Sequence, residues 1–299
     1  MGVMWWKVGL LLAAHHVWAT PGGPARRVCS SASSIPSMVT SDRLFRSIEV
    51  KEEEHHASSC ISSWGRVLDA GTGDHSLNWL TSLPIDSLVA VTGDKPRSLS
   101  LRKSFPQPNV EILAGNWNDP TFLEGQEFDV VIADYLVGAI EGHAPYFQDE
   151  IFPRLFKHVA SGGRLYVVGL QPITMTLDPA KRKTTQEKLV LEMQRVRDAC
   201  ILLAGHRPYR EFPLDWILRH LSHAGFNVVS HAFFPNRYTM SMIKRQIAVG
   251  RNKLPLFLDK NFANSMEAYL SELDRQAEAA TTEGPFEFGF DYVVAATKP

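Results

Sequence analysis

Cysteine is scarce in this chain, and the few cysteines follow no spacing that carries chemistry. Only Cys29, Cys60 and Cys200 occur among the 299 residues. Three isolated thiols form neither a disulfide framework nor the paired spacing of a metal site. The sequence therefore indicates a reducing compartment, or a fold that does not depend on redox state.

An excess of charge of either sign is also lacking. The formal net charge is −1 and the pI is about 6.8, so no overall positive field attracts nucleic acid. A local basic run at residues 181–183 is followed by Glu187, Glu192 and Asp198 among further basic residues. That mixture is typical of a solvated helix face, and we expect no nucleic-acid partner.

No acidic residue precedes Asp42. Lys7 is followed by the apolar run 8–14 and then by a small residue, which is the pattern of a signal peptide and is too short for a membrane span. The next residues are rich in Ser, Pro and Ala and contain arginine. We expect residues 1–41 to be a bipartite targeting segment for a complex plastid, with a mitochondrial presequence or secretion as alternatives, and 42–299 to be the folded domain.

A glycine turn between a strand and a helix is the most informative feature that is present. In residues 65–77 an apolar strand ends in Asp69, and Gly71 and Gly73 follow before a helix begins. Because glycine has no Cβ atom, such a turn can take positive φ and bring the backbone against a ligand. Asp69 can accept hydrogen bonds from the turn or from an amine on the ligand. The segment predicts a nucleoside-binding site.

The spacing of Asp69, Gly71 and Gly73 resembles motif I of the class I S-adenosylmethionine (SAM)-dependent methyltransferases. The resemblance implies SAM as the cofactor and an α/β fold with a Rossmann-like, seven-stranded, mostly parallel sheet and helices on both faces. The alternative is an NAD(P)-dependent oxidoreductase, but Ser76 stands where its third glycine would be, and Asp69 would repel a pyrophosphate. His75 is a departure, since many members of the family have glycine there.

Two further strands follow in the order that this family implies. The strand at residues 87–91 ends near Asp94, whose carboxylate suits the two hydroxyls of a ribose. The alternative is that Asp94 caps a helix that begins just after it. The strand at 110–114 leads to Asn116, which we expect to pair with the adenine amino group, and to Trp117, which we expect to cover the adenine ring.

The fourth strand, residues 128–134, resembles the motif IV region of the same family. Its carboxyl end should face the transferred methyl group, so the predicted catalytic residues are Asp134, Tyr135 and His143, with Glu141 close by. His143 is the first candidate for a general base because an imidazole titrates near neutral pH. The candidates behind it are His75, His206 and His231.

The rest of the pattern completes the sheet and adds two insertions. The expected elements are a helix at 144–160, a turn and fifth strand at 161–169, a helix at 214–223, a sixth strand at 226–229 and a seventh at 289–297. Helical insertions after the fifth and sixth strands, at about 171–212 and 233–284, should lie above the carboxyl edge of the sheet. There they would form a lid that covers the acceptor and excludes water.

These patterns lead to one predicted function and one main alternative. We expect a SAM-dependent methyltransferase that acts on an oxygen, nitrogen or sulfur atom of a small molecule. The run that follows Ala133 lacks the Pro-Pro-aromatic motif of nucleobase amino-group methylation, and Gln171 and Pro172 supply no second acid for a metal ion. The alternative is a methyltransferase-like binding or assembly factor without catalysis.

Overall fold

A computed structural model describes residues 42–59, 62–173 and 184–299 of the chain. The predicted targeting segment, residues 1–41, and the basic run 181–183 lie outside the described residues. No helix in the described ranges is both long enough and apolar enough to cross a membrane.

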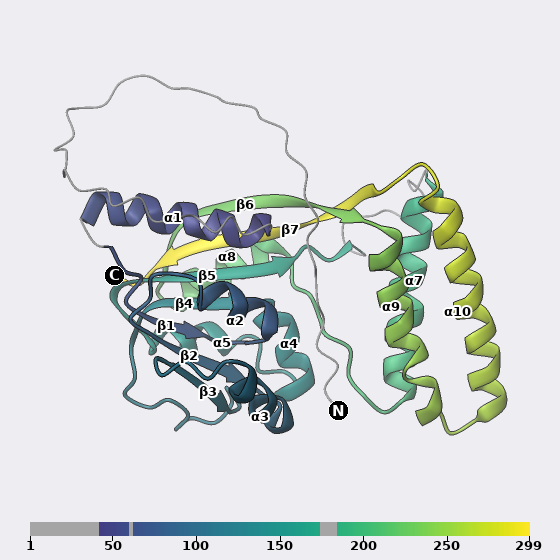
Figure 1. The fold of residues 1–299 in the computed structure, drawn as a ribbon, viewed down its shortest axis with the longest axis horizontal. Helices are drawn as coiled ribbons and strands as arrows, with labels where there is room; N and C mark the ends of the chain where they lie inside the picture. The colour runs from purple at the N-terminus through teal and green to yellow at the C-terminus, as the bar shows by residue number, and fades with distance from the viewer. Residues whose placement is uncertain (1–41, 60–61, 174–183) are drawn as a thin grey trace, which may run out of the picture.

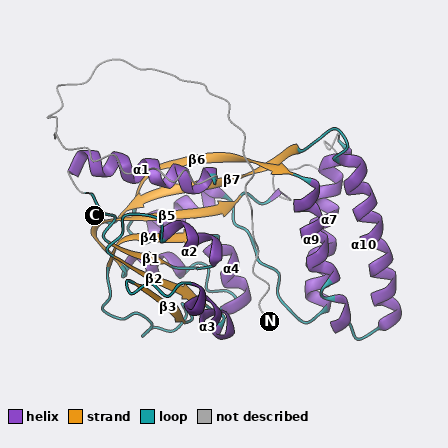
Figure 2. Cartoon of the chain, in the orientation of Figure 1, coloured by secondary structure: helices purple, strands orange, loops and turns teal. Residues whose placement is uncertain are grey.

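The described residues contain a seven-stranded sheet in the order β3-β2-β1-β4-β5-β7-β6 (Figure 2). Its strands are β1 (Arg66–Asp69), β2 (Ser87–Thr92), β3 (Val110–Ala114), β4 (Phe128–Asp134), β5 (Val159–Leu170), β6 (Asn227–Tyr238) and β7 (Phe286–Thr297). The first five strands pair in parallel, and β7 runs antiparallel to both β5 and β6. This sheet confirms the predicted Rossmann-like fold class.

Helices cover both faces of the sheet because successive residues of its central strands point apolar side chains to opposite faces. In β1, Val67 packs toward one face and Leu68 toward the other, and both are fully buried. The first face carries α1 (Arg43–Ser59), α2 (Asp74–Leu80) and α3 (Lys95–Ser104). The second carries α4 (Leu136–His143), α5 (Ile151–Phe156) and α8 (Leu214–His223).

Three long helices form a separate apolar cluster beside the sheet, at the right in Figure 1. They are α7 (Thr185–Leu203), α9 (Met240–Arg251) and α10 (Lys260–Ala280), with the short 3₁₀ helix η2 (Leu254–Leu256) between the last two. The expected helical insertions are therefore present. The second one begins later than predicted, because β6 continues through Phe233 to Tyr238 and pairs with β7 along that extension.

The single helix predicted at residues 144–160 is wrong. Within that range the only helix is the short α5, since α4 ends at His143, and β5 already begins at Val159. The physical reason is proline: a proline ring blocks the hydrogen bond of a helix interior and fits only the first turn. Pro145 follows the end of α4, and Pro153 lies in the first turn of α5.

Helix α1 is held on the sheet by a buried ion pair that the sequence patterns did not predict. Glu52 is fully buried, and its carboxylate accepts hydrogen bonds from Arg164 Nε at 2.9 Å and Arg164 Nη2 at 2.6 Å. The Tyr166 hydroxyl donates to the same carboxylate at 2.6 Å. Both partners lie on β5, so this helix is fixed across the middle of the sheet.

Candidate functional site

A cavity of about 1100 Å³ opens at the carboxyl edge of the parallel strands. Its floor is made by the residues that follow four of these strands, at 70–73, 91–94, 115–117 and 134–136. In a parallel α/β sheet this edge, at the point where β1 and β4 lie side by side, is where ligands bind. The cavity therefore coincides with the site that the glycine turn predicts.

The glycine turn after β1 is tied into both neighbouring strands. The N–H of Ala70 donates to Ile132 on β4 at 2.8 Å, and the N–H of Thr72 donates to Val91 on β2 at 2.7 Å. The expectation of positive φ in this turn is wrong, since neither Gly71 nor Gly73 has it. The absence of a Cβ matters instead for close packing, because a Cβ on Gly71 would lie 3.2 Å from Leu136 Cδ1.

Asp69 lies beneath the turn as a buried carboxylate. The residue is fully buried, and neither oxygen has a hydrogen bond of normal geometry to any described residue. Burial raises the pKa of Asp69 to about 6, while the Ser76 and Thr72 hydroxyls and the N–H of Gly71 oppose that rise. A buried carboxylate of this kind stabilises a cation bound above it.

Asp134 places a second carboxylate, half-buried, at the end of the adjacent strand, β4. Its Oδ1 atom is buried without a hydrogen-bond partner among the described residues, and the residue lines the cavity. Burial raises the pKa of Asp134 to about 7, and the negative charges of Asp69 and Asp42 add to the rise. A positively charged ligand in the cavity would relieve this repulsion.

Tyr135 turns the chain from β4 into α4 and adopts a conformation that side chains rarely take. Its φ of 49° and ψ of 20° are left-handed, and burial raises its pKa well above the usual value. Backbone strain of this kind persists where the surrounding structure enforces it, often at ligand sites. The structure thus brings Asp134 and Tyr135 together on one wall of the cavity.

Asp94 follows β2 and lines the same cavity. Its Oδ1 atom accepts a hydrogen bond from the N–H of Arg97 at 3.0 Å, so it caps α3, as the alternative interpretation expected. The side chain of Arg97 pairs with Asp74 at the start of α2. The contact of Asp94 with a ribose stays a prediction.

Asn116 and Trp117 also line the cavity, but each already holds another part of the site. Asn116 Nδ2 donates to the carbonyl oxygen of His143 at 2.8 Å. Trp117 is 3% exposed, and its Nε1 atom donates to the carbonyl oxygen of Ala70 at 2.8 Å. The indole therefore supports the glycine turn from within the core, and the adenine contacts of both residues stay predictions.

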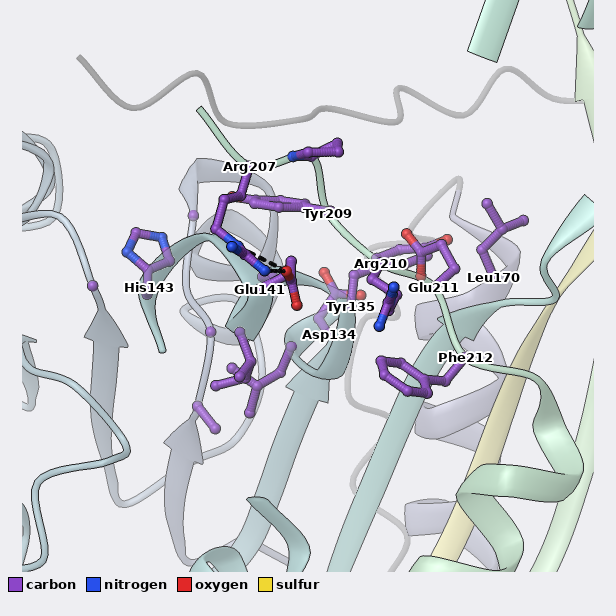
Figure 3. Close-up of a pocket in the computed structure, with 18 of the residues that line it drawn as sticks. Asp134, Tyr135, Glu141, His143, Leu170, Arg207, Tyr209, Arg210, Glu211 and Phe212 are labelled. Atoms are coloured by element: carbon purple, nitrogen blue, oxygen red, sulfur yellow. Dashed lines mark hydrogen bonds and ion pairs between the residues drawn. The ribbon is translucent and has the colours of Figure 1, made fainter. Parts of the chain in front are cut away.

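His143 lies away from the position that the sequence suggested. A Cβ on Gly93 would lie 2.5 Å from His143 Nδ1, so the imidazole packs on the residue that follows β2. His143 lines the same cavity as Asp134 and Tyr135, which Figure 3 labels, but it lies at the end of α4 against the residue after β2 and not beside them at the end of β4. Its role as a general base stays a prediction.

The other candidate histidines are spread over the molecule. His75 lines the cavity, and its Nε2 atom lies 2.9 Å from Asp42 Oδ2. His206 lies 3.1 Å from Lys253 Nζ, and His231 lies on β6 beside Phe233. Neither of the latter two lines the cavity. Across the residues that the structure describes, no group of three His, Cys, Asp or Glu side chains could hold a metal ion.

A segment that the sequence analysis did not single out closes one side of the cavity. We call residues 207–213 the strap; Figure 3 shows Arg207 and Tyr209 of the strap beside Glu141 of α4. The strap lies close to that helix because Gly138 and Gly142 have no side chains: a Cβ on Gly138 would lie 3.2 Å from the Arg210 carbonyl oxygen, and one on Gly142 3.2 Å from the Tyr209 ring. Two glycines four residues apart in a helix were the available signal.

Arg207 fixes the first residue of the strap to α4. Its Nε atom donates to Glu141 Oε1 at 2.8 Å, and its guanidinium lies 5.2 Å from the centre of the Tyr146 ring. Glu141 is 6% exposed and also accepts a hydrogen bond from Gln148 at 2.7 Å. Glu141 therefore anchors the strap to α4, and its expected place near the reacting atoms stays a prediction.

Comparisons with known proteins bear on the fold. No protein-family model and no curated protein sequence matches the chain. The YcgJ protein from Bacillus subtilis is similar in structure, with a TM-score of 0.50 and 16% identity, over 85% of this chain and 98% of that one.

Two further solved structures are similar over comparable lengths. A SAM-dependent methyltransferase from Archaeoglobus fulgidus has a TM-score of 0.44 and 12% identity, over 84% of this chain and 94% of that one. The cyclopropane synthase MmaA2 from Mycobacterium tuberculosis has a TM-score of 0.44 and 16% identity, over 78% of each chain. Identities this low speak for the fold alone. The strand order, together with the YcgJ match, gives this chain a Rossmann-like α/β fold.

Proposed function

We propose that the protein is a SAM-dependent methyltransferase that acts on an oxygen, nitrogen or sulfur atom of a small molecule. The observation that carries the proposal is a pair of carboxylates, the buried Asp69 and the half-buried Asp134, at the ends of adjacent strands beneath and beside the cavity. Both Asp69 oxygens and Asp134 Oδ1 have no hydrogen bond of normal geometry to the described residues, and burial raises both pKa values. Such a site favours a ligand that is itself positively charged and disfavours a pyrophosphate.

The residues that line the cavity offer a partner for each part of SAM. The turn at 70–73 would take the amino-acid part, Asp94 the ribose, and Asn116 and Trp117 the adenine. SAM supplies an electrophilic methyl group, which an acceptor lone pair takes as the carbon–sulfur bond breaks and S-adenosylhomocysteine (SAH) is left. Asp134 and Tyr135 would lie beside the acceptor, where a carboxylate with a pKa near neutrality can receive its proton.

Two alternatives make different predictions. A nicotinamide-dependent oxidoreductase would need its pyrophosphate beside Asp69, where like charges repel. A binding or assembly factor could keep the cavity and bind SAM without turnover. The strap and α7 line the same cavity of about 1100 Å³ as the glycine turn, so it has walls beyond those of the predicted cofactor site, which favours the enzyme.

The test is a calorimetric titration of the full chain with SAM, SAH and NAD. We expect SAM and SAH to bind and NAD not to bind. Gly71→Val should abolish binding of both, since it fills space at the turn and against Leu136, whereas Asn78→Ala on the exposed side of α2 should not change it. Circular dichroism must show that the Gly71 variant is folded. Binding of NAD in place of SAM would contradict the proposal, and SAM binding without consumption across a metabolite screen would favour the assembly factor.

A further inference from the structure

One arginine in the cavity differs from all the others. The paired arginines and their partners are Arg97 with Asp74, Arg195 with Glu192, Arg197 with Asp198, Arg207 with Glu141 and Arg219 with Asp215. Arg210 also lines the cavity, but within the described part of the chain its guanidinium has neither a hydrogen bond nor an ion pair. Figure 3 shows it among the residues of the cavity, on the strap. A cation of this kind is available to a ligand.

The backbone that carries Arg210 is held in place on both sides. Its own N–H donates to the carbonyl oxygen of Gly138 on α4 at 3.3 Å. Two residues further on, the carbonyl oxygen of Phe212 accepts a hydrogen bond from the Tyr292 hydroxyl at 2.8 Å. The N–H of Leu214 then donates to Gln171 Oε1 at 3.0 Å. The strap is therefore a fixed wall, and it presents Arg210 from a preorganised position.

Aromatic rings line the cavity together with Arg210. Phe212 packs on Trp216 with ring centres 4.3 Å apart, and Tyr135 and Tyr209 line the same cavity. These rings offer apolar faces to the body of a ligand. A guanidinium offers a planar fork of donors that matches a carboxylate or a phosphate.

The negative charge of Asp134 gives such a ligand one orientation. An anionic group is repelled from Asp134 and attracted to Arg210, so the charged end of the molecule points to the strap. The other end then faces Asp134 and Tyr135. From this arrangement we infer that the methyl acceptor is an organic acid with an apolar or aromatic body, whose carboxylate or phosphate binds Arg210. The inference rests on the proposed methyltransferase function.

The test uses three defined probes on the full chain saturated with SAH. The probes are 4-hydroxybenzoate, 4-hydroxyphenyl phosphate and the neutral methyl 4-hydroxybenzoate, each titrated by calorimetry. We expect at least one anion to bind about tenfold more tightly than the neutral ester. The two anionic arms distinguish a carboxylate from a phosphate.

A matched pair of variants locates the anion. Arg210→Gln should abolish the preference for the anion and leave the affinities for the ester and for SAH unchanged. Arg219→Gln is the control, because that arginine lines the same cavity but is paired with Asp215, and it should keep the preference. Circular dichroism checks that both variants are folded.

Each other outcome overturns the inference. Equal affinity for the anions and the ester removes the acid preference, and an equal loss in both variants makes the effect one of general charge. A loss of SAH affinity in Arg210→Gln would assign this arginine to the cofactor's own carboxylate. If the parent chain does not bind SAH, the proposed function fails, and the same titrations on the chain alone still decide whether Arg210 binds anions.

Discussion

His75 and Asp42 join the start of α1 to the start of α2, with 2.9 Å between His75 Nε2 and Asp42 Oδ2. The other carboxylate oxygen of Asp42 accepts a hydrogen bond from the N–H of Leu44 at 2.8 Å. The His75 ring also stacks on Phe45, with ring centres 4.9 Å apart. The histidine that departs from the family's glycine thus has a structural task at the rim of the cavity.

This pair predicts a pH-dependent stability. The hydrogen bond to Asp42 raises the pKa of His75 above 6.5; burial raises the pKa of Asp42, but the hydrogen bonds from His75 and Leu44 lower it overall. The stabilisation is therefore complete between about pH 4 and 6.5 and is lost as the pH rises through the folded pKa of His75. Asp42→Asn keeps a helix cap but removes the charge.

We expect Asp42→Asn to lower the free energy of unfolding by about 0.5 to 1.5 kcal/mol near pH 5.5 and by less near pH 8.5, because the pair is partly exposed. Urea denaturation at the two pH values measures the difference. An equal loss at both would mean that the charge of His75 does not contribute.

The buried ion pair of α1 predicts a large and local loss of stability. Glu52→Gln leaves Arg164 buried without its counter-charge, so the free energy of unfolding should fall by about 3 kcal/mol. Lys51→Met is the control on the same helix, since it breaks only an exposed pair with Glu54 and should cost less than about 0.5 kcal/mol. Similar losses in the two variants, measured by urea denaturation, would rule out a special contribution of Glu52.

Asp134 predicts a conflict between stability and ligand binding. Its pKa rises from 3.8 to about 7 on folding, so the folded state binds the proton more tightly and loses stability as the pH rises between those values. Asp134→Asn should therefore stabilise the unliganded protein at about pH 8 by about 1 kcal/mol or more. Thermal unfolding without ligand measures this effect.

The same variant should lose the preference for the charged cofactor. SAM and SAH share their amino-acid and adenosine parts, so the affinity for SAM divided by the affinity for SAH isolates the contribution of the sulfonium charge. In the parent chain this ratio should rise with pH through about 7, as Asp134 ionises, and it should be flat in Asp134→Asn. A ratio that changes with pH to the same extent in both proteins would place the sulfonium away from Asp134.

The contact between Gly93 and His143 predicts that substitutions at the two positions have coupled effects on stability. Gly93→Ala puts a Cβ atom 2.5 Å from His143 Nδ1 and should destabilise the fold by about 1 to 3 kcal/mol. His143→Ala removes an exposed ring and should restore part of that loss in the double variant, with a coupling of at least about 0.5 kcal/mol. Additive effects in urea denaturation would show that the imidazole is not packed on Gly93 in solution.

The sequence alone determined the parts of the fold that depend on local pattern. The short apolar runs predicted the central strands, and the spacing of Asp69, Gly71 and Gly73 predicted the position of the cavity. These features depend on residues close together in the chain, whose preferences act over a few positions. The helical character of both insertions was predicted for the same reason, although α9 was not singled out.

Only the tertiary structure decided how the side chains of the site are distributed. His143 packs on Gly93 because the length and direction of α4 determine where the helix ends. Trp117 lies in the core because its indole N–H donates to the carbonyl oxygen of Ala70. The strap depends on contacts between residues about seventy positions apart, such as Arg210 with Gly138. Pairings across such separations are chosen by packing and burial in three dimensions, which no local pattern records.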